Sequence, residues 1–216
     1  MIGRVTIKVC GITRAADAAA ALHLGADWIG VNVWAQSPRH VPADRRPALL
    51  REIPAGKRVA IAVNPTPGEA QALLAEGFDA VQAHFDPAEK ACDPQALSAA
   101  VGPDHLWLAP RLPAGQPFPA ALLPLARTFV QDAHQAGAFG GTGQKADWKR
   151  FTETLRAHPG VRWVLAGGLG PDNVAEAVTA GALFLDLNSQ VELSPGLKSA
   201  EKLHQVGEAL RKITQS

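Results

Sequence analysis

The first feature of this sequence that could do chemistry is a carboxylate followed by a glycine-rich stretch. The stretch VQDAHQAGAFGGTGQKADW begins as a buried strand, ends that strand at Asp132, and carries four glycines before a helix can start. A carboxyl group at a strand end can transfer protons as a general acid, or it can simply be a turn residue. Glycine lets backbone N–H groups approach an anion without a side-chain clash, so Gly140, Gly141 and Gly143 are candidate phosphate contacts or a merely flexible loop.

A thiol near the N-terminus is the second candidate. Cys10 lies in KVCGIT, and a free cysteine is most often a small buried hydrophobe, the interpretation that spacing alone favours. Cys10 nevertheless ends a strand, and Lys8, two residues earlier, points to the same face. A cation beside the thiol would favour the thiolate. If Lys8 points inward it needs a partner, and Asp186, on the strand predicted to neighbour the first, is the candidate.

Two further strand ends resemble anion sites. In LAGGLGPDNV a strand is followed by Gly167 and Gly168 and then by a helix, an arrangement that holds phosphate in many barrels or forms a tight turn without a ligand. The stretch DLNSQ, at residues 186–190, ends the last predicted strand and supplies the loop after it, where Ser189 is a possible hydroxyl donor.

Polar residues also follow the second and fourth strands. Arg39 comes after a proline-fixed turn in SPRHV, where it could bind a carboxylate with two hydrogen bonds or be an ordinary surface arginine. Gln82 and His84 stand at the end of the fourth strand, and His84 is less easily dismissed as a solvated histidine than the other histidines.

These residues need a scaffold that brings strand ends together. Short β-branched runs alternate with Ala- and Leu-rich helical runs at a period of about 25 residues. The strands are predicted at Arg4–Cys10, Asp27–Val33, Arg58–Val63, Asp79–Ala83, His105–Ala109, Thr128–Asp132, Arg162–Ala166 and Leu183–Leu187. The helices are predicted at Arg14–Leu24, Ala43–Glu52, Pro67–Glu76, Pro94–Val101, Asp147–Ala157, Pro171–Ala180 and Lys198–Lys212, with a poor one at Pro119–Ala126.

Eight strand–helix units in a chain of 216 residues favour an α/β fold, a (β/α)8 TIM barrel, near its minimum size. The competing architecture is an open doubly wound sheet, but no GxGxxG follows the first strand. No linker or low-complexity segment divides the chain, so we expect one catalytic domain over residues 1–216. In a barrel, function belongs at the C-terminal ends of the strands, where every candidate above lies.

Composition narrows the class of protein. A net charge of +1 gives no electrostatic reason to expect nucleic acid or an anionic membrane as partner. The N-terminus carries no signal-like apolar run, and every apolar stretch is interrupted, so we expect a cytoplasmic protein. Cys10 and Cys92 show no metal-binding spacing, and free thiols fit a reducing compartment.

The motifs, in their order along the chain, resemble those of the phosphoribosylanthranilate isomerase family of tryptophan biosynthesis. The matching stretches are KVCGIT, DWIGVNVWAQSPRHV, VQAH, VQDA, GGTG, LAGGLGPDNV and DLNS, which extend from Lys8 to about Lys198. The family is a (β/α)8 barrel that performs an Amadori rearrangement without metal or cofactor. The resemblance therefore implies an isomerase that acts on a phosphorylated small molecule, as a monomer or homodimer.

The resemblance also implies roles for single residues. Cys10 would be the general base, Asp132 the general acid, and Arg39 the residue that holds the anthranilate carboxylate. The residues expected to surround the rest of the substrate are Gln82, His84, Gly140, Gly141, Gly143, Gly167, Gly168, Asp186, Asn188 and Ser189.

The sequence departs from the family pattern at a few places. Phe85 replaces a glycine after the fourth strand, and Gln190 replaces a glycine near the expected phosphate. Asn32 and Trp34 replace apolar and smaller aromatic residues, which could reshape the anthranilate side. Two alternatives stay open: an isomerase of another aminoaldose phosphate, and a non-catalytic relative that only binds phosphorylated ligands.

Overall fold

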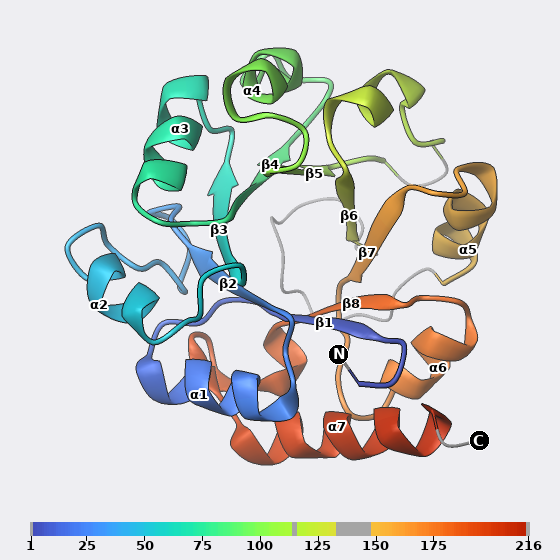
Figure 1. The fold of residues 1–216 in the computed structure, drawn as a ribbon. Helices are drawn as coiled ribbons and strands as arrows, with labels where there is room; N and C mark the ends of the chain where they lie inside the picture. Colours follow the sequence, from blue (N-terminus) through green and yellow to red (C-terminus); the bar gives the residue numbers. More distant parts are fainter. Residues whose placement is uncertain (1, 114–115, 133–147, 215–216) are drawn as a thin grey trace.

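The computed structural model describes residues 2–113, 116–132 and 148–214, and it forms a closed barrel of eight parallel strands (Figure 1). The strands follow one another around the barrel in chain order, and β1 closes it by pairing with β8. The predicted TIM barrel is therefore confirmed. The strands are β1 Thr6–Val9, β2 Trp28–Asn32, β3 Arg58–Val63, β4 Ala80–Phe85, β5 Leu106–Pro110, β6 Thr128–Asp132, β7 Arg162–Ala166 and β8 Phe184–Leu187.

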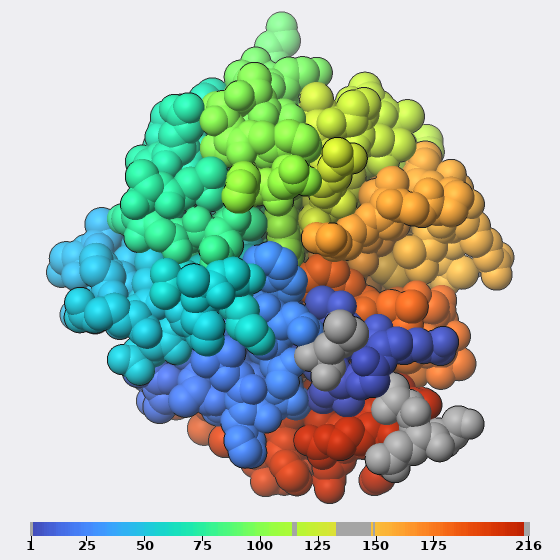
Figure 2. Space-filling view, viewed as in Figure 1, coloured from blue at the N-terminus to red at the C-terminus, as the bar shows by residue number. Residues whose placement is uncertain are grey.

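Helices surround the strands on the outside of the barrel (Figure 1). Figure 2 shows the first and last segments of the chain side by side, in agreement with the packing of α1 on α7. The α-helices are α1 Ala15–Leu24, α2 Arg46–Arg51, α3 Pro67–Ala75, α4 Pro94–Val101, α5 Trp148–Ala157, α6 Val174–Thr179 and α7 Ala200–Thr214.

Three predicted helices before β8 differ from the structure in type or begin three residues later. The segment predicted as a poor helix forms the 3-10 helix η1, Ala120–Leu125, with Pro124 inside it. Proline lacks the N–H that an α-helix needs, which explains the short irregular turn. The helices α2 and α6 begin three residues later than predicted, α6 only after Asn173, whose backbone is not helical.

The largest difference lies after β8. The helix predicted from Lys198 begins two residues later, at Ala200, and before it the structure has a 3-10 turn, η2 (Ser189–Val191), and a hairpin of β9 (Glu192–Ser194) and β10 (Leu197–Lys198) that the sequence did not predict. The hairpin turns at Gly196, whose φ is +82°. Such a backbone conformation favours glycine. Lys198 is therefore a strand residue that faces Glu192 in the hairpin register.

Local capping chemistry fixes the ends of several helices. Gly25, Gly77 and Gly181, each at or next to the end of a helix, have positive φ values of 101°, 106° and 98°. Glycine in this left-handed conformation commonly ends a helix. At the start of α3 the Thr66 side chain accepts the Glu69 N–H while the Glu69 carboxylate accepts the Thr66 N–H, which is a capping box.

The core has two layers. Between strands and helices lie the apolar residues that alternate outward from the barrel, among them Phe85 and Phe129. The barrel interior is filled by a second cluster in which Trp107 packs edge-on against Trp28 and Phe184, with ring centroids 5.0 Å and 5.6 Å apart. Edge-to-face contacts of this kind are a preferred packing of aromatic rings. Within the described part of the chain, no helix is long and apolar enough to cross a membrane.

We predict that Thr66→Ala lowers the free energy of unfolding by about 1 kcal/mol, because the N–H of Glu69 loses its acceptor. Thr66→Ser keeps the hydroxyl and should lie close to wild type. Urea denaturation followed by circular dichroism measures both, and equal stability of the alanine and serine variants would contradict the role of the cap.

Candidate active site

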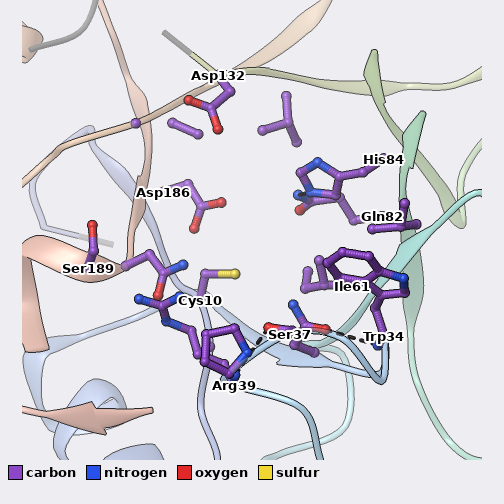
Figure 3. Close-up of a pocket in the computed structure, with 18 of the residues that line it drawn as sticks. Cys10, Trp34, Ser37, Arg39, Ile61, Gln82, His84, Asp132, Asp186 and Ser189 are labelled. Carbon is purple, nitrogen blue, oxygen red and sulfur yellow. Dashed lines mark hydrogen bonds between the residues drawn. The ribbon is translucent and has the colours of Figure 1, made fainter. Parts of the chain in front are cut away.

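A cavity of about 310 Å³ opens at the C-terminal ends of the barrel strands (Figure 3). Its walls come from the ends of most of the strands and from the loops that follow β2, β7 and β8. Ten of the sequence-predicted residues line it: Cys10, Arg39, Gln82, His84, Asp132, Gly167, Gly168, Asp186, Asn188 and Ser189. The other three, Gly140, Gly141 and Gly143, lie outside the described residues.

Cys10 directly follows β1 and is only 7% exposed. The neighbouring Gly30 makes room for it, because a Cβ there would lie 3.0 Å from the Cys10 sulfur and 3.2 Å from Lys8 Cε. Burial raises the pKa of the Cys10 thiol, while the Lys8 and Lys198 ammonium groups lower it in part. The predicted cation is present, but burial outweighs it, so the thiolate is a stronger base than that of a free cysteine.

The predicted partner of Lys8 is confirmed. The parallel register of β1 and β8 sets Lys8 opposite Asp186, and Lys8 Nζ donates to Asp186 Oδ2 at 2.7 Å. Both side chains are buried, at 0% and 6% exposure. Burial raises the pKa of the Asp186 carboxyl against the opposing pull of Lys8. Asp186 Oδ1 has no hydrogen-bond partner among the described residues and is a free acceptor at the cavity.

Asp132 ends β6, where it is paired in register with Ala166 of β7. In the close-up, Asp132 and Cys10 lie on different sides of the cavity, with Asp186 between them in that view (Figure 3). β1 and β6 are separated around the barrel by β8 and β7. A carboxyl group and a thiol therefore reach the same space from separate walls, the arrangement that acid and base on two sides of a ligand require.

β4 presents Gln82 and His84 to the cavity, because residues two apart share a face. Gln82 Nε2 and His84 Nε2 are 2.7 Å apart. Burial and the Lys8 charge lower the pKa of His84 to about 4, so the imidazole is neutral near pH 7 and its Nε2 can accept from the amide. Phe85, with 1% exposure, points into the outer core, so this departure from the family pattern leaves the cavity wall unchanged.

Arg39 reaches the cavity over Gly11. A Cβ at Gly11 would lie 2.5 Å from Arg39 Cδ and 2.8 Å from Asn188 Oδ1, and the Gly11 φ is +73°. Both the close approach and the positive φ favour glycine there. Arg39 forms a bidentate ion pair with Glu192, and Lys198 Nζ donates to the same carboxylate at 2.8 Å. Sequence reasoning missed Glu192 and Lys198; the only signal for Glu192 was its place two residues after Gln190, where the sequence departs from the family pattern.

The loops after β7 and β8 form the opposite part of the wall. Gly167 and Gly168 have φ values of +97° and +64°, and no described residue accepts a hydrogen bond from either N–H. The Asn173 side chain braces this turn, since its amide accepts the Gly170 N–H and donates to the Gly168 carbonyl, both at 2.9 Å. Unpaired N–H groups on a braced turn are suited to an anion.

The other departures from the family pattern also have structural places. Gln190 packs on the β7 loop, where a Cβ at Gly170 would lie 2.6 Å from Gln190 Cβ, and it is not among the described residues that line the cavity. Asn32 Oδ1 accepts the Trp34 N–H at 2.9 Å, which shapes the loop after β2, and both residues line the cavity. Trp34 therefore contributes an aromatic surface to the Arg39 side.

Metal ligation has no grouping to support it in this part of the protein. Across residues 2–113, 116–132 and 148–214, no three His, Cys, Asp or Glu side chains are placed to share an ion. The second cysteine, Cys92, is half-buried before α4, and burial together with Asp93 raises its pKa to about 11.

Comparisons with known proteins agree with the geometry. Residues 7–209 match the model of the family described as N-(5'phosphoribosyl)anthranilate (PRA) isomerase. The N-(5'-phosphoribosyl)anthranilate isomerase of Bordetella bronchiseptica is 38% identical, over 98% of each chain. That of Nitrosomonas eutropha is 32% identical, over 93% of each chain. The crystal structure of phosphoribosyl anthranilate isomerase from Thermus thermophilus superimposes with a TM-score of 0.77 at 28% identity, covering 96% of this chain and 99% of that one.

We predict opposite effects of the two buried charges on the reactivity of Cys10. Lys8→Met removes the cation that stabilises the thiolate, so alkylation by iodoacetamide at pH 8 should slow by about tenfold for each unit of pKa increase. Asp186→Asn removes a neighbouring anion and should speed it. Both are measured in a Cys92→Ser background by mass spectrometry. Equal rates in the two variants would contradict electrostatic control of this thiol.

Proposed function

The chain belongs to the N-(5'-phosphoribosyl)anthranilate isomerase family, and we propose that its cavity catalyses this isomerisation with Cys10 as general base and Asp132 as general acid. The function is an aldose–ketose isomerisation in tryptophan biosynthesis, in which a phosphorylated aminoaldose, N-(5-phosphoribosyl)anthranilate, becomes 1-(2-carboxyphenylamino)-1-deoxyribulose 5-phosphate. The observation that carries the assignment of roles is that a thiol and a carboxyl group enter one cavity from separate strands, β1 and β6.

The first step is ring opening. The furanose oxygen is a poor leaving group until it is protonated, and Asp132 donates that proton while the nitrogen lone pair forms an iminium at C1. A carboxylic acid that donates near neutral pH needs a pKa above its usual value, and the growing negative charge on Asp132 is compensated by the iminium that appears in the same step.

The second step is removal of the C2 proton. The iminium acidifies this hydrogen, and the Cys10 thiolate takes it, which gives an enolamine that tautomerises to the ketone. Burial raises the pKa of Cys10, which makes its thiolate more basic. The Lys8 charge lowers this pKa in part, so that the thiolate can still form. The cationic intermediate beside the sulfur adds to that stabilisation, because opposite charges attract strongly away from water.

The two ends of the substrate have separate binding groups in this proposal. The N–H groups of Gly167 and Gly168, with Ser189, bind the phosphate, and Arg39 binds the anthranilate carboxylate beside Trp34. The proposal also assigns phosphate contacts to Gly140, Gly141 and Gly143, which lie outside the described residues. Binding energy from these non-reacting ends orients the sugar between acid and base.

The steps move only protons and bond electrons within one substrate, so the proposal includes neither metal nor cofactor. A pathway enzyme of this kind works in the cytoplasm, as a monomer or homodimer. Its partner is the small phosphorylated substrate, with no role for nucleic acid or a membrane.

We predict that Cys10→Ser and Asp132→Asn each lower kcat by about 10²- to 10⁴-fold, since one proton-transfer group is lost. Product affinity should stay within about tenfold, because binding groups are retained. Fluorescence of the anthranilate group follows turnover, and calorimetry gives product affinity. Cys92→Ser is the matched control with normal turnover; normal turnover in either site variant would refute that residue's role.

We predict that Gly168→Val weakens binding of inorganic phosphate and product together. The Gly168 φ is +64°. A Cβ at this φ forces the turn to change and moves its N–H groups. Gly68→Val is the control, since Gly68 lies at the start of α3 with open space around its Cβ position. Calorimetry on both folded variants decides; unchanged phosphate affinity in Gly168→Val would make this turn merely structural.

A further inference from the structure

The hairpin that follows η2 carries a buried carboxylate, Glu192, and both of its oxygens accept hydrogen bonds. Glu192 is 5% exposed, and its Oε1 accepts from Lys198 Nζ at 2.8 Å, from Arg39 Nε at 2.9 Å and from the Gly196 N–H at 3.1 Å. Its Oε2 accepts from Arg39 Nη2 at 2.6 Å. Neither Glu192 nor Lys198 is among the described residues that line the cavity, so the pair acts on a ligand only through its neighbours.

The same bonds leave one side of the Arg39 guanidinium open. Nε and Nη2 are directed at Glu192, while Nη1 has no hydrogen-bond partner among the described residues. The Arg39 side chain is 11% exposed and lines the cavity. A guanidinium is planar, so two bonds to one carboxylate fix the direction in which the remaining N–H groups point.

The charges of Arg39, Lys198 and Glu192 leave one positive charge in excess. Burial alone would raise the pKa of Glu192, but its hydrogen bonds with Arg39 and Lys198 hold it below the usual value, so the carboxylate is ionised near neutral pH. Two cations and one anion give a net charge of +1 on these side chains, which a single carboxylate of a ligand would neutralise.

We propose that Glu192 is a positioning residue that orients Arg39 toward the aryl carboxylate, so that the β9–β10 hairpin selects aminoaldose phosphates whose amine carries an ortho-carboxylate. This inference rests on the proposed function and assigns a task to a hairpin that lies outside the eight-stranded barrel sheet. Glu192 does not touch the substrate; it sets the angle of the group that does.

The hairpin is fixed to the barrel, as a positioning element must be. Thr13 Oγ1, in the loop after β1, donates to the Gly196 carbonyl at 2.7 Å, and Lys202 of α7 donates to the Glu192 carbonyl at 2.8 Å. The Lys198 N–H donates to Asp17 of α1 at 3.3 Å, and Lys198 Nζ also donates to Asn188 Oδ1 at 3.0 Å. These contacts to α1, α7 and the β8 loop hold the Glu192 carboxylate at a fixed position beside Arg39.

The test compares Glu192→Gln and Glu192→Asp with a matched control. Positioning predicts that both weaken product binding and raise KM by about tenfold while kcat changes by less than about threefold, because the carboxylate clamp binds ground and transition states alike. Glu76→Gln removes the carboxylate partner of Arg46, a partly buried ion pair beside α3 and outside this cavity, and should leave KM unchanged.

The direction of the change in product affinity distinguishes a positioning role of Glu192 from a purely electrostatic one. If Glu192 only offset positive charge, Glu192→Gln would bind the anionic product more tightly, and Glu192→Asp would leave affinity unchanged. Either outcome overturns the inference. A product analogue without the carboxyl group, 1-phenylamino-1-deoxyribulose 5-phosphate, supplies the second readout: its affinity should be the same in wild type and both variants, since only the carboxylate end is affected.

A double-mutant cycle with Arg39→Ala separates this inference from the proposed function. Arg39→Ala alone should weaken product binding, and Glu192→Gln should add nothing further in that background. If Arg39→Ala leaves product affinity unchanged, the carboxylate role of Arg39 in the proposed function fails, and the positioning role fails with it. If Arg39→Ala weakens binding but Glu192→Gln does not, the positioning role alone is wrong.

Discussion

The buried ion pair between Lys8 and Asp186 is the constraint around which the cavity is organised. Removing two charges from water is costly. The pair is tolerable only because β1 and β8 set Lys8 Nζ and Asp186 Oδ2 2.7 Å apart. It also joins the first strand to the last, where the barrel closes. The remaining oxygen of Asp186 faces the cavity, and the Lys8 charge acts on both Cys10 and His84. This one pair therefore influences the charge of three groups that could contact a ligand: Asp186, Cys10 and His84.

The barrel interior divides into an apolar part and a polar part. Trp107, with Trp28 and Phe184, fills one region of the interior as a packed aromatic cluster. Near the C-terminal strand ends, the ion-paired side chains of the described residues around Cys10 are three cations, Lys8, Arg39 and Lys198, and two carboxylates, Asp186 and Glu192. Three positive and two negative charges leave one positive charge, which suits an anionic ligand. Burial raises the pKa of the Cys10 thiol while the Lys8 and Lys198 ammonium groups lower it, which makes the thiolate a strong base that can still form.

Much of the site could be predicted because a barrel converts chain position into spatial position. Once eight strand–helix units are recognised, every strand end must meet at one rim, so Cys10, Gln82, Asp132 and Gly168 could be grouped before any distance was known. Even the Lys8–Asp186 contact followed from strand adjacency and the alternation of side chains along a strand. The helix predicted from Lys198 is present as α7, but the hairpin before it was missed because a two-strand hairpin gives a weak local signal beside a strongly helical segment.

The sequence by itself determined the fold class, the family and the end of the barrel at which the candidate site residues gather, since these depend on periodic patterns and short motifs. Only the tertiary structure decided which charges balance one another. Arg39 and Glu192 are far apart in the chain, and their pairing depends on how the fold places the loop after β2 against the hairpin after β8. Likewise, whether burial or Lys8 dominates the pKa of Cys10 depends on how completely neighbouring side chains exclude water, and packing of the whole barrel sets that.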